Sequence, residues 1–301
     1  MIYDKPWKSI DEQVKLLTDS KGLACDDVET LKQALVEIGY YRLSAYWFPY
    51  KIIGSDGCSR FRSGTSFEAV LRSYEFDRRL RLLMFDAIGK IEVFLRSRIS
   101  HLASRESGAF GYPENAIPRL KREFAAAKKS EQYIKHFGAK YGDAHDLPPY
   151  WMMTECVTMG TIEILYSGVS PQTRIAIASE LGIKVPVLKN WISVLRAARN
   201  ACCHHSRVWN RTWGVKPVIP KAWKSFSGSN DKTFAVLSVL AYALDKIRDS
   251  PQWVRELEEL LSEFDDVSRE MIGFPRGWKE SSPWSNIASS NPDEEKHNDI
   301  R

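Results

Sequence analysis

The chain has 301 residues, of which 44% are hydrophobic and 27% are charged. This balance excludes a disordered or fibrous protein and leaves room for one large domain or two small ones. Charge appears from Asp4 onward, and the longest uncharged apolar-rich run, Phe234–Leu244, is too short to span a bilayer, so we expect a cytoplasmic protein without a membrane segment. The five cysteines are odd in number and irregularly spaced, which indicates reduced thiols rather than a disulfide framework.

The net charge of +5 is distributed unevenly. The stretch Lys184–Lys224 holds nine Lys and Arg residues and no Asp or Glu, so it carries +9 while the remainder carries −4. Four tryptophans are interleaved with these cations: Trp191, Trp209, Trp213 and Trp223. Such a stretch attracts polyanions and offers rings on which unpaired bases stack. The alternative is a solvated helix face with tryptophans in the core.

Helix signals dominate the chain in order. Capping-box patterns, in which an acidic residue follows three positions after Ser, Thr or Asp, predict helices that begin after Ser9, Asp26 and Thr65. The third helix is the longest, because no proline interrupts residues 50–112 and apolar residues recur at three- and four-residue spacing: Met84, Ile88, Ile91, Leu95, Ile99 and Leu102. Further helices are predicted over residues 118–141 in two pieces, 151–166, 171–181, 186 to about 205, 231–248 and 252–264. Clear two-residue strand periodicity is absent.

These elements predict an all-α protein, a helical bundle preceded by a small helical subdomain. We place the N-terminal subdomain at residues 1–64 and the bundle at 65–270. Residues 271–301 are rich in serine and proline with an acidic cluster, Asp293–Glu295, and are predicted to form a largely disordered tail.

One short motif stands out chemically. Arg199 is followed directly by Asn200 and, after four intervening residues, by His204, an R-x4-H pattern. Alone this pattern is weak, because a second match runs from Arg96 to His101 and is interpreted as chance. The motif therefore needs context.

That context is a resemblance carried by five motifs in one order. They are Tyr40–Tyr46 (YYRLSAY), Phe76–Arg81 (FDRRLR), Ile91–Ser97 (IEVFLRS), Pro148–Trp151 (PPYW) and Arg199–Arg211 (RNACCHHSRVWNR). In this order they resemble the Abi-like family of bacterial abortive-infection proteins of the AbiD/AbiF type, over about residues 5–211. A Gly-Phe-Pro at Gly273 and Trp278 extend the likeness.

The resemblance implies a HEPN-like fold and a function. In the HEPN superfamily an R-x4-6-H motif marks metal-independent RNA-cleaving sites, usually composed across a dimer. It therefore implies an endoribonuclease toxin of an anti-phage system that acts as a homodimer and needs no metal or other cofactor. An antitoxin, either protein or RNA, is a further partner of the kind this class implies.

The physical reading of the motif agrees in part. Cleavage of RNA by its own 2′-OH needs a proton acceptor, a proton donor and positive charge at the phosphate, which histidine and arginine supply. At about 100° per residue, Asn200 and His204 share a face of a helix, whereas Arg199 and His204 lie about 140° apart. Such a site is workable if two subunits face each other or if the helix ends near Cys203.

Roles follow from this chemistry. We assign His204 as general acid or base, Arg199 as the group that holds the phosphate, and Asn200 as an orienting residue. RNA-binding candidates are the nearby arginines Arg196, Arg207 and Arg211. Supporting candidates are His205, Glu92 and Arg96, for which the alternatives are a packed histidine and a simple intrahelical ion pair.

Two competing interpretations concern the same residues. Cys202, Cys203, His204 and His205 are adjacent in a helix and diverge by about 100° each, so they cannot close one zinc tetrahedron. We therefore predict no metal site. The alternative function is a non-catalytic module in phage defence that binds RNA or a protein through the same basic stretch.

Overall fold

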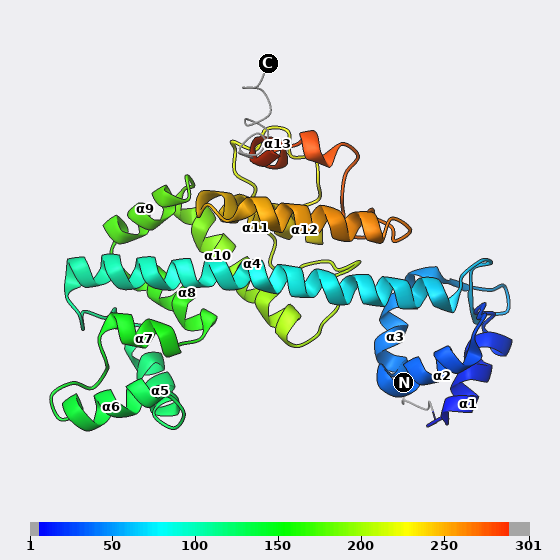
Figure 1. The fold of residues 1–301 in the computed structure, drawn as a ribbon, viewed down its shortest axis with the longest axis horizontal. Helices are drawn as coiled ribbons and strands as arrows, with labels where there is room; N and C mark the ends of the chain where they lie inside the picture. Colours follow the sequence, from blue (N-terminus) through cyan, green and yellow to red (C-terminus); the bar gives the residue numbers. More distant parts are fainter. Residues whose placement is uncertain (1–5, 289–301) are drawn as a thin grey trace, which may run out of the picture. The chain divides into compact units, whose positions relative to one another are not determined.

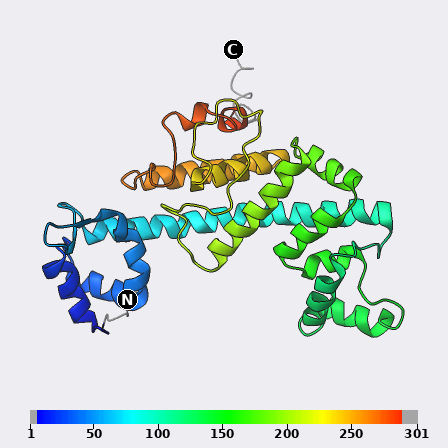
Figure 2. The same ribbon diagram turned by 180° about the vertical axis from the view of Figure 1, so that it is seen from behind.

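The structure is a computed structural model that describes residues 6–288. The chain folds as two compact units. The first comprises the chain up to Leu80 together with Leu260–Ser268, and the second comprises Arg81–Glu259 and the residues from Arg269 onward. The described residues are mainly helical, as Figures 1 and 2 show from two sides, which confirms the predicted all-α class. The proposed domain boundaries at residues 64 and 270 stay a prediction.

The first unit contains short helices and one hairpin. Its elements are α1 (Ile10–Lys15), the π-helical η1 (Leu16–Ser20), α2 (Val28–Glu37), α3 (Tyr40–Trp47), the 3-10 turn η2 (Phe48–Tyr50), β1 (Lys51–Ile53), β2 (Ser59–Phe61) and the start of α4 (Phe67–Ser107). The two strands pair antiparallel, with Lys51 opposite Phe61. Each strand has three residues, too few for a two-residue period to show in the sequence.

Helix caps in this unit follow the sequence signals closely. Ser9 and Glu12 form the predicted reciprocal capping box of α1. The other two caps lie one residue later than predicted: the carboxylate of Asp27 accepts from the backbone N–H groups at the start of α2, and Ser66 Oγ accepts from an N–H in the first turn of α4. Asp and Ser serve equally well at such positions, so neighbouring candidates are hard to separate from sequence.

The segment Leu260–Ser268 returns the chain to the first unit. The Phe264 ring lies 5.6 Å from the Phe76 ring. The Arg72 guanidinium lies 4.6 Å from the Phe264 ring centre and donates to the Asp266 carboxylate at 2.8 Å. Residues almost 200 positions apart therefore share one core, which local sequence patterns do not reveal.

The second unit contains the remaining helices. They are the rest of α4, α5 (Ile117–Ala127), α6 (Gln132–Tyr141), α7 (Tyr150–Cys156), α8 (Met159–Gly168), α9 (Pro171–Glu180), α10 (Val185–Cys203), α11 (Thr233–Lys246), α12 (Ser250–Glu263) up to residue 259, the 3-10 turn η3 (Trp278–Glu280) and α13 (Trp284–Ala288). In Figure 1, α4 passes in front of α10, and in Figure 2 α10 passes in front of α4, so the two helices cross. Helix α10 also contacts α8, α9 and α11.

The core of this unit lies on the predicted faces. The apolar stripe of α4 from Met84 to Leu102 is buried, and α11 is buried over most of its length. The helix predicted over residues 151–166 is instead two helices, because Val157 and Thr158 adopt extended backbone conformations between α7 and α8.

Residues 271–288 differ from the predicted tail. They contain η3 and α13, and they bury three aromatic side chains, Phe274, Trp278 and Trp284. The Trp284 indole donates to Ser238 Oγ of α11 at 2.9 Å, and its ring stacks against Phe234. The high content of serine and proline predicts disorder, but the three aromatic side chains supply enough apolar surface for these residues to pack. Residues 289–301, the rest of the predicted tail, lie outside the described residues.

Candidate functional site

Helix α10 carries the R-x4-H motif at its C-terminal end. The predicted apolar stripe of this helix is buried: Leu188, Trp191, Ile192, Leu195, Ala198 and Cys202. Trp191 packs with Trp223 and with Val239 of α11. This packing fixes the rotation of α10 and so decides which of its side chains face solvent.

Helix α10 ends at Cys203, directly before the histidine of the motif. His204 is the C-cap, and His205 follows in the left-handed conformation with φ of 54°. The His205 N–H donates to the Cys202 carbonyl at 3.1 Å, and the Ser206 N–H donates to the Ala201 carbonyl at 2.8 Å. These two bonds form a Schellman motif, which satisfies the last carbonyls of the helix. The helix therefore stops at Cys203, as the motif geometry allowed.

The segment after the helix is held in place by the start of α11. Val208 and Trp209 are fully buried. The Thr233 hydroxyl donates to the Val208 carbonyl at 2.7 Å and accepts from the Trp213 indole at 3.0 Å. One buried hydroxyl thus anchors both ends of the turn that follows His204 and His205.

The chain then runs back along α10. The Asn190 side chain donates to the Lys216 carbonyl at 3.1 Å and accepts from the Val218 N–H at 2.7 Å. The Trp191 indole donates to the Val218 carbonyl at 2.9 Å. All four tryptophans that marked the basic stretch are buried core residues, and three of them are fully buried: Trp191, Trp209 and Trp213. They therefore follow the alternative predicted from the sequence, tryptophans in the core, and offer no rings on which bases could stack.

The three residues assigned to catalysis lie together at this helix end. Arg199 and Asn200 lie in the last turn, and the His204 N–H donates to the Asn200 carbonyl at 3.0 Å. Asn200 and His204 are exposed, and Arg199 is half-buried. Between residues 6 and 288, none of these three side chains has a hydrogen bond or an ion pair. A cation, an amide and an imidazole are thus left available at one end of α10.

The arginines predicted to bind RNA have contacts within the chain. Arg196 pairs with the Glu163 carboxylate of α8 at 2.6 Å. Arg207 donates to the Asn210 carbonyl at 3.3 Å, and Arg211 donates to the Arg207 carbonyl at 3.2 Å and lies 4.5 Å from the Trp213 ring centre. Arg207 and Arg211 therefore shape the turn that follows the motif.

Glu92 and Arg96 form a half-buried ion pair within α4, as the commoner interpretation predicted. Arg96 also donates to two backbone carbonyls where α7 ends, those of Thr154 and Val157, the latter at 2.8 Å. These carbonyls have lost their helical partners, and the guanidinium replaces them. The hydrogen bonds of Arg96 accompany the break between α7 and α8, and within the described chain no hydrogen bond or ion pair of Glu92 or Arg96 is with α10.

A second polar network joins α5 to α8. Glu123 accepts from both Thr158 and Thr161, and Arg119 donates to Glu123 at 3.1 Å. Burial raises the pKa of the Glu123 carboxyl, but these hydrogen bonds outweigh it and hold the pKa below its ordinary value of 4.5. The four-residue spacing of Arg119 and Glu123 indicates their pairing from the sequence alone. The hydrogen bonds from Thr158 and Thr161 to Glu123 depend on the tertiary structure and leave no local pattern in the sequence.

Gly160 makes room for arginines on both sides of α8. A Cβ at this position would lie 3.0 Å from the Arg119 guanidinium and 3.6 Å from the Arg196 side chain. A larger residue would push one of these side chains away. This glycine serves close packing rather than backbone conformation.

Several lysines of the basic stretch are exposed and uncompensated. In the part of the chain that the structure describes, no carboxylate lies within 4 Å of four exposed lysines: Lys184, Lys189, Lys221 and Lys224. Lys216, by contrast, lies 3.7 Å from Asp231. The charge asymmetry read from the sequence therefore persists at the surface.

The cysteines and histidines around the motif differ in exposure, and His205 is not the packed histidine that one interpretation predicted. Cys202 is buried in the apolar stripe, while His204 and His205 are exposed. All five cysteines are free thiols. Among residues 6–288, no three His, Cys, Asp or Glu side chains gather as a metal site would require.

Comparison with known proteins gives one match. The sequence model of a family described as "Abi-like protein" matches residues 33–210. This range includes the R-x4-H motif and ends within the turn that follows it. No curated protein and no solved structure gives a match. Over the described residues, no helix is both long enough and apolar enough to cross a membrane.

Proposed function

The chain belongs to the Abi-like protein family, which points to abortive infection and phage defence, and we propose that within this role it is a metal-independent RNA endonuclease. The observation that carries the proposal is the end of α10, where Arg199, Asn200 and His204 have no partner within the described chain. Charged side chains nearby, such as Arg196, are paired. Functional groups left unpaired beside a well-connected scaffold are what a substrate site needs.

The proposed reaction uses the 2′-OH of the RNA as nucleophile. Its oxygen attacks the adjacent phosphorus, the bond from phosphorus to the 5′-oxygen breaks, and the products carry a 2′,3′-cyclic phosphate and a 5′-OH. One proton leaves the 2′-OH and one is delivered to the 5′-oxygen, so His204 serves as general acid or base. Arg199 stabilises the negative charge that builds on the phosphate oxygens, and Asn200 orients one of the reacting groups.

A second copy of the chain completes this proposal. The reaction needs both a proton acceptor and a proton donor, whereas the R-x4-H motif of one chain holds a single histidine, His204. Two facing helix ends would supply both groups and two arginines, as a symmetric dimer can. Size-exclusion chromatography with light scattering reports the mass that this arrangement requires. An antitoxin that covers the two helix ends is the corresponding restraining partner.

The test compares wild type with His204→Ala. Both are incubated with total bacterial RNA in EDTA, and new RNA ends are mapped and examined for cyclic phosphates. We expect wild type to produce cyclic ends and His204→Ala to lose at least about 100-fold in rate, because a general acid or base contributes 10²–10⁴-fold.

His136→Ala is the matched control, since His136 is also exposed and lies on α6 of the same unit. Its activity should equal that of wild type. Cleavage that survives in His204→Ala would contradict the assignment of His204, and intact RNA with wild type would contradict the proposed activity.

The exposed lysines favour one alternative, a module that binds RNA without cleaving it. Four uncompensated cations in one segment attract a polyanion whether or not a reaction follows. Under this alternative wild type leaves RNA intact and His204→Ala binds it with the same affinity. RNA cleavage and RNA binding are both measured on the same preparations of wild type and His204→Ala.

A further inference from the structure

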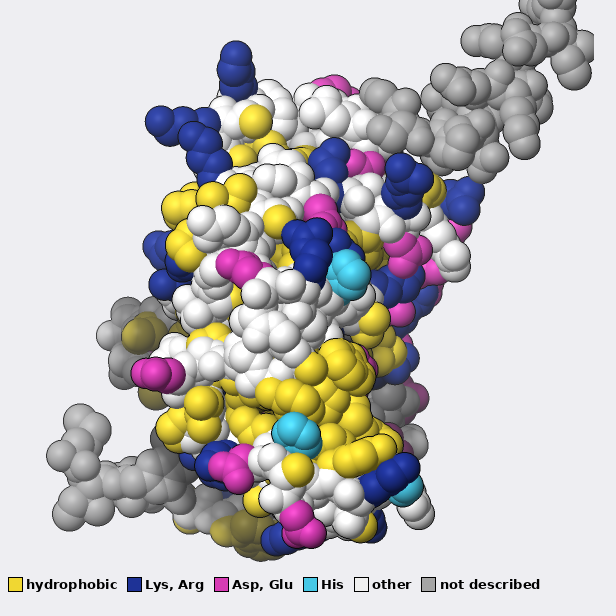
Figure 3. Space-filling model, turned by 90° about the vertical axis from the view of Figure 1, so that its left-hand side faces the viewer, with side chains coloured by type: hydrophobic (Ala, Val, Ile, Leu, Met, Phe, Trp, Pro, Cys, Tyr) yellow, Lys and Arg dark blue, Asp and Glu magenta, His cyan; other side chains and the backbone are white. Residues whose placement is uncertain are grey.

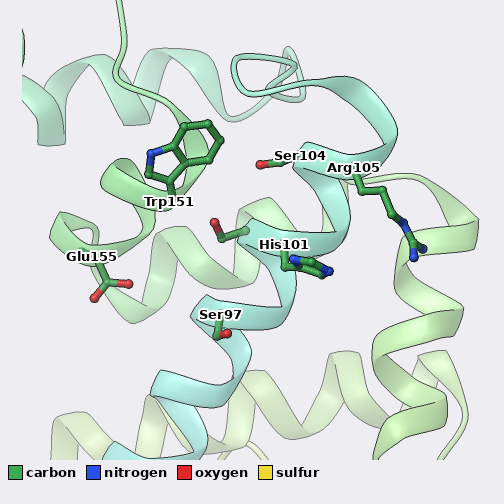
Figure 4. A pocket seen from close by; sticks show the side chains of 7 residues that line it. Ser97, His101, Ser104, Arg105, Trp151 and Glu155 are labelled. Atoms are coloured by element: carbon green, nitrogen blue, oxygen red, sulfur yellow. The ribbon is translucent and has the colours of Figure 1, made fainter.

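A hollow in the second unit lies away from the residues of the R-x4-H motif. It has a volume of about 530 Å³, within the range of small-molecule sites, roughly 300–1,000 Å³. Its lining comes from the C-terminal half of α4 and from α7. Figure 4 shows Trp151 and Glu155 on α7 and Ser97 and Ser104 on the part of α4 nearest to them, whereas the side chains of His101 and Arg105 extend from α4 in the direction away from Trp151. None of these residues has a role in the function proposed above.

The Trp151 ring is held out toward solvent by the residues around it. Its neighbour Tyr150 is fully buried and donates to the Gly111 carbonyl at 3.0 Å. The Tyr112 hydroxyl donates to the Pro148 carbonyl at 2.7 Å. The Pro-Pro-Tyr-Trp motif is thus anchored on both sides while Trp151 remains 56% exposed. In the described chain no ring contact or hydrogen bond of the Trp151 side chain occurs.

The floor of the hollow offers hydroxyl groups that the helix does not use. Serines within helices commonly donate to the carbonyl four residues earlier, as Ser107 does to Ala103 at 2.8 Å. Over residues 6–288, Ser97, Ser100 and Ser104 make no such bond, and the Ser104 Oγ is buried without a partner. A buried hydroxyl without a partner is costly, so it favours a ligand that supplies one.

Charge gives the hollow two different sides. His101 and Arg105 are exposed on α4, one turn apart, and neither is paired with another described residue. Glu155 is exposed on α7, one turn after Trp151. An anionic group is therefore favoured on the side of Arg105 and disfavoured beside Trp151, where a flat uncharged ring fits instead.

We propose that this hollow binds a nucleotide unit, with its base stacked on Trp151 and its phosphate at Arg105 and His101. The serine hydroxyls bond to the sugar or to the edge of the base. The unit is either a free mononucleotide or one unpaired nucleotide of an RNA strand, which share this chemistry. The site acts independently of the cleavage proposed at His204.

Figure 3 shows the surface that lies on the left-hand side of Figure 1. Hydrophobic side chains gather on the lower half of this surface, where α5, α6 and α7 lie in Figure 1. Exposed aromatic residues in this region besides Trp151 include Phe110 and Tyr141. Aromatic surface next to separate cations suits unpaired bases better than it suits a bare phosphate ion.

The experiment measures binding by isothermal titration calorimetry at fixed salt. The probes are AMP, CMP, GMP and UMP, and separately a single-stranded RNA hexamer. We expect Trp151→Ala and Arg105→Ala each to weaken binding about fivefold or more, because the first removes the stacking ring and the second removes the cation at the phosphate. Trp151→Phe, which keeps a stacking ring, should retain most of the affinity.

Trp7→Ala and Arg122→Ala are the matched controls, because both residues are exposed and lie outside the hollow. They should bind as wild type does. Loss of mononucleotide binding in the Trp151→Ala variant identifies a free nucleotide as the ligand, and loss restricted to the hexamer identifies a nucleotide within RNA. Circular dichroism verifies the folding of each variant.

The proposal is overturned if wild type binds neither probe, or if Trp151→Ala binds both as wild type does. Equal losses in the Trp7→Ala control would also overturn it, since the effect would not belong to the hollow. The His204→Ala protein separates this site from the cleavage site. It should bind the mononucleotides with unchanged affinity even where it no longer cleaves RNA.

Discussion

At the scale of single residues, the backbone of His205 is as informative as its side chain. A left-handed conformation costs an L-residue about 1–2 kcal/mol, and glycine is the usual residue at this position of a Schellman motif. Histidine is among the residues that enter this conformation more often than most. The structure thus shows a local role for His205 in ending α10, beside the supporting role predicted from sequence.

We predict that His205→Gly is more stable than His205→Ala by about 1 kcal/mol. Both variants remove the imidazole, and only the alanine variant bears the cost of φ near 54°. Urea unfolding followed by circular dichroism measures the difference. Equal stability of the two variants would mean that the left-handed turn is not maintained in solution.

The Glu123 carboxylate leads to a pH-dependent prediction. Its pKa is lowered in the folded state, so its contribution to stability is present above the unfolded pKa and is lost as pH falls through the folded pKa. Glu123→Gln should lower the free energy of unfolding by about 1–3 kcal/mol at pH 7, since hydrogen bonds to a charged group are weakened.

This loss should shrink as the pH falls below 4.5, the ordinary value for a glutamate, because wild type then protonates as well. Urea titrations from pH 3 to pH 7 test the trend. The matched control is Glu131→Gln, an exposed carboxylate at the start of α6. A gap between wild type and Glu123→Gln that stays constant with pH would contradict the prediction.

At the scale of elements, the turn after α10 depends on α11. Thr233 is fully buried and bonds to both Val208 and Trp213. Thr233→Val keeps the shape but leaves a buried carbonyl and a buried indole N–H without partners, which should cost about 3 kcal/mol. RNA cleavage should fall as well, because the turn adjoins His204.

Thr233→Ser provides the comparison, since it keeps the hydroxyl and removes one methyl group. Thr233→Ser should lower the free energy of unfolding by about 1 kcal/mol and should cleave RNA at a rate near that of wild type. Urea unfolding and the cleavage assay are made on the same preparations. If valine is tolerated as well as serine, the hydroxyl does not anchor the turn.

Helix boundaries also show where sequence patterns stop being informative. The stripe of α10 and the long helix α4 were predictable because a buried face imposes a three- and four-residue repeat. The break between α7 and α8 was not, because it depends on Arg96, which lies 58 positions before Thr154 and binds the freed carbonyls. The β1–β2 hairpin was too short to show a period.

At the scale of the whole molecule, the uneven charge leads to a prediction about salt. If RNA phosphates contact the basic stretch, replacing three exposed lysines by glutamine should make RNA binding less dependent on salt: Lys184, Lys189 and Lys221. For single strands each lost phosphate contact changes the slope of log K against log salt by about 0.7, so the total change should reach about 2.

The control replaces three exposed lysines of α6 and of the turn that precedes it, at positions 129, 135 and 140. It changes the net charge equally but lies outside the basic stretch. Binding isotherms between 50 and 300 mM salt distinguish the two variants. The same change of slope in both would mean that RNA responds to total charge and not to this segment.

The sequence by itself determined the all-α class, the apolar faces of the main helices, the family, and the identity of the residues at the candidate site. These properties are local or are carried by short motifs in order, so neighbouring residues are enough to establish them. The end of α10 at Cys203 was left open by the sequence, and the tertiary structure decided it through the Schellman motif and its anchor at Thr233.

Only the tertiary structure decided which charged side chains remain available. Arg96 donates to the Thr154 and Val157 carbonyls and Arg196 pairs with Glu163, all far away in the sequence, whereas within the described chain Arg105 and Arg199 have no such partner. It also joined residues 260–268 to the first unit and packed residues 271–288 against α11. The physical reason is that pairing and packing depend on contacts across long sequence separations, which no local pattern encodes.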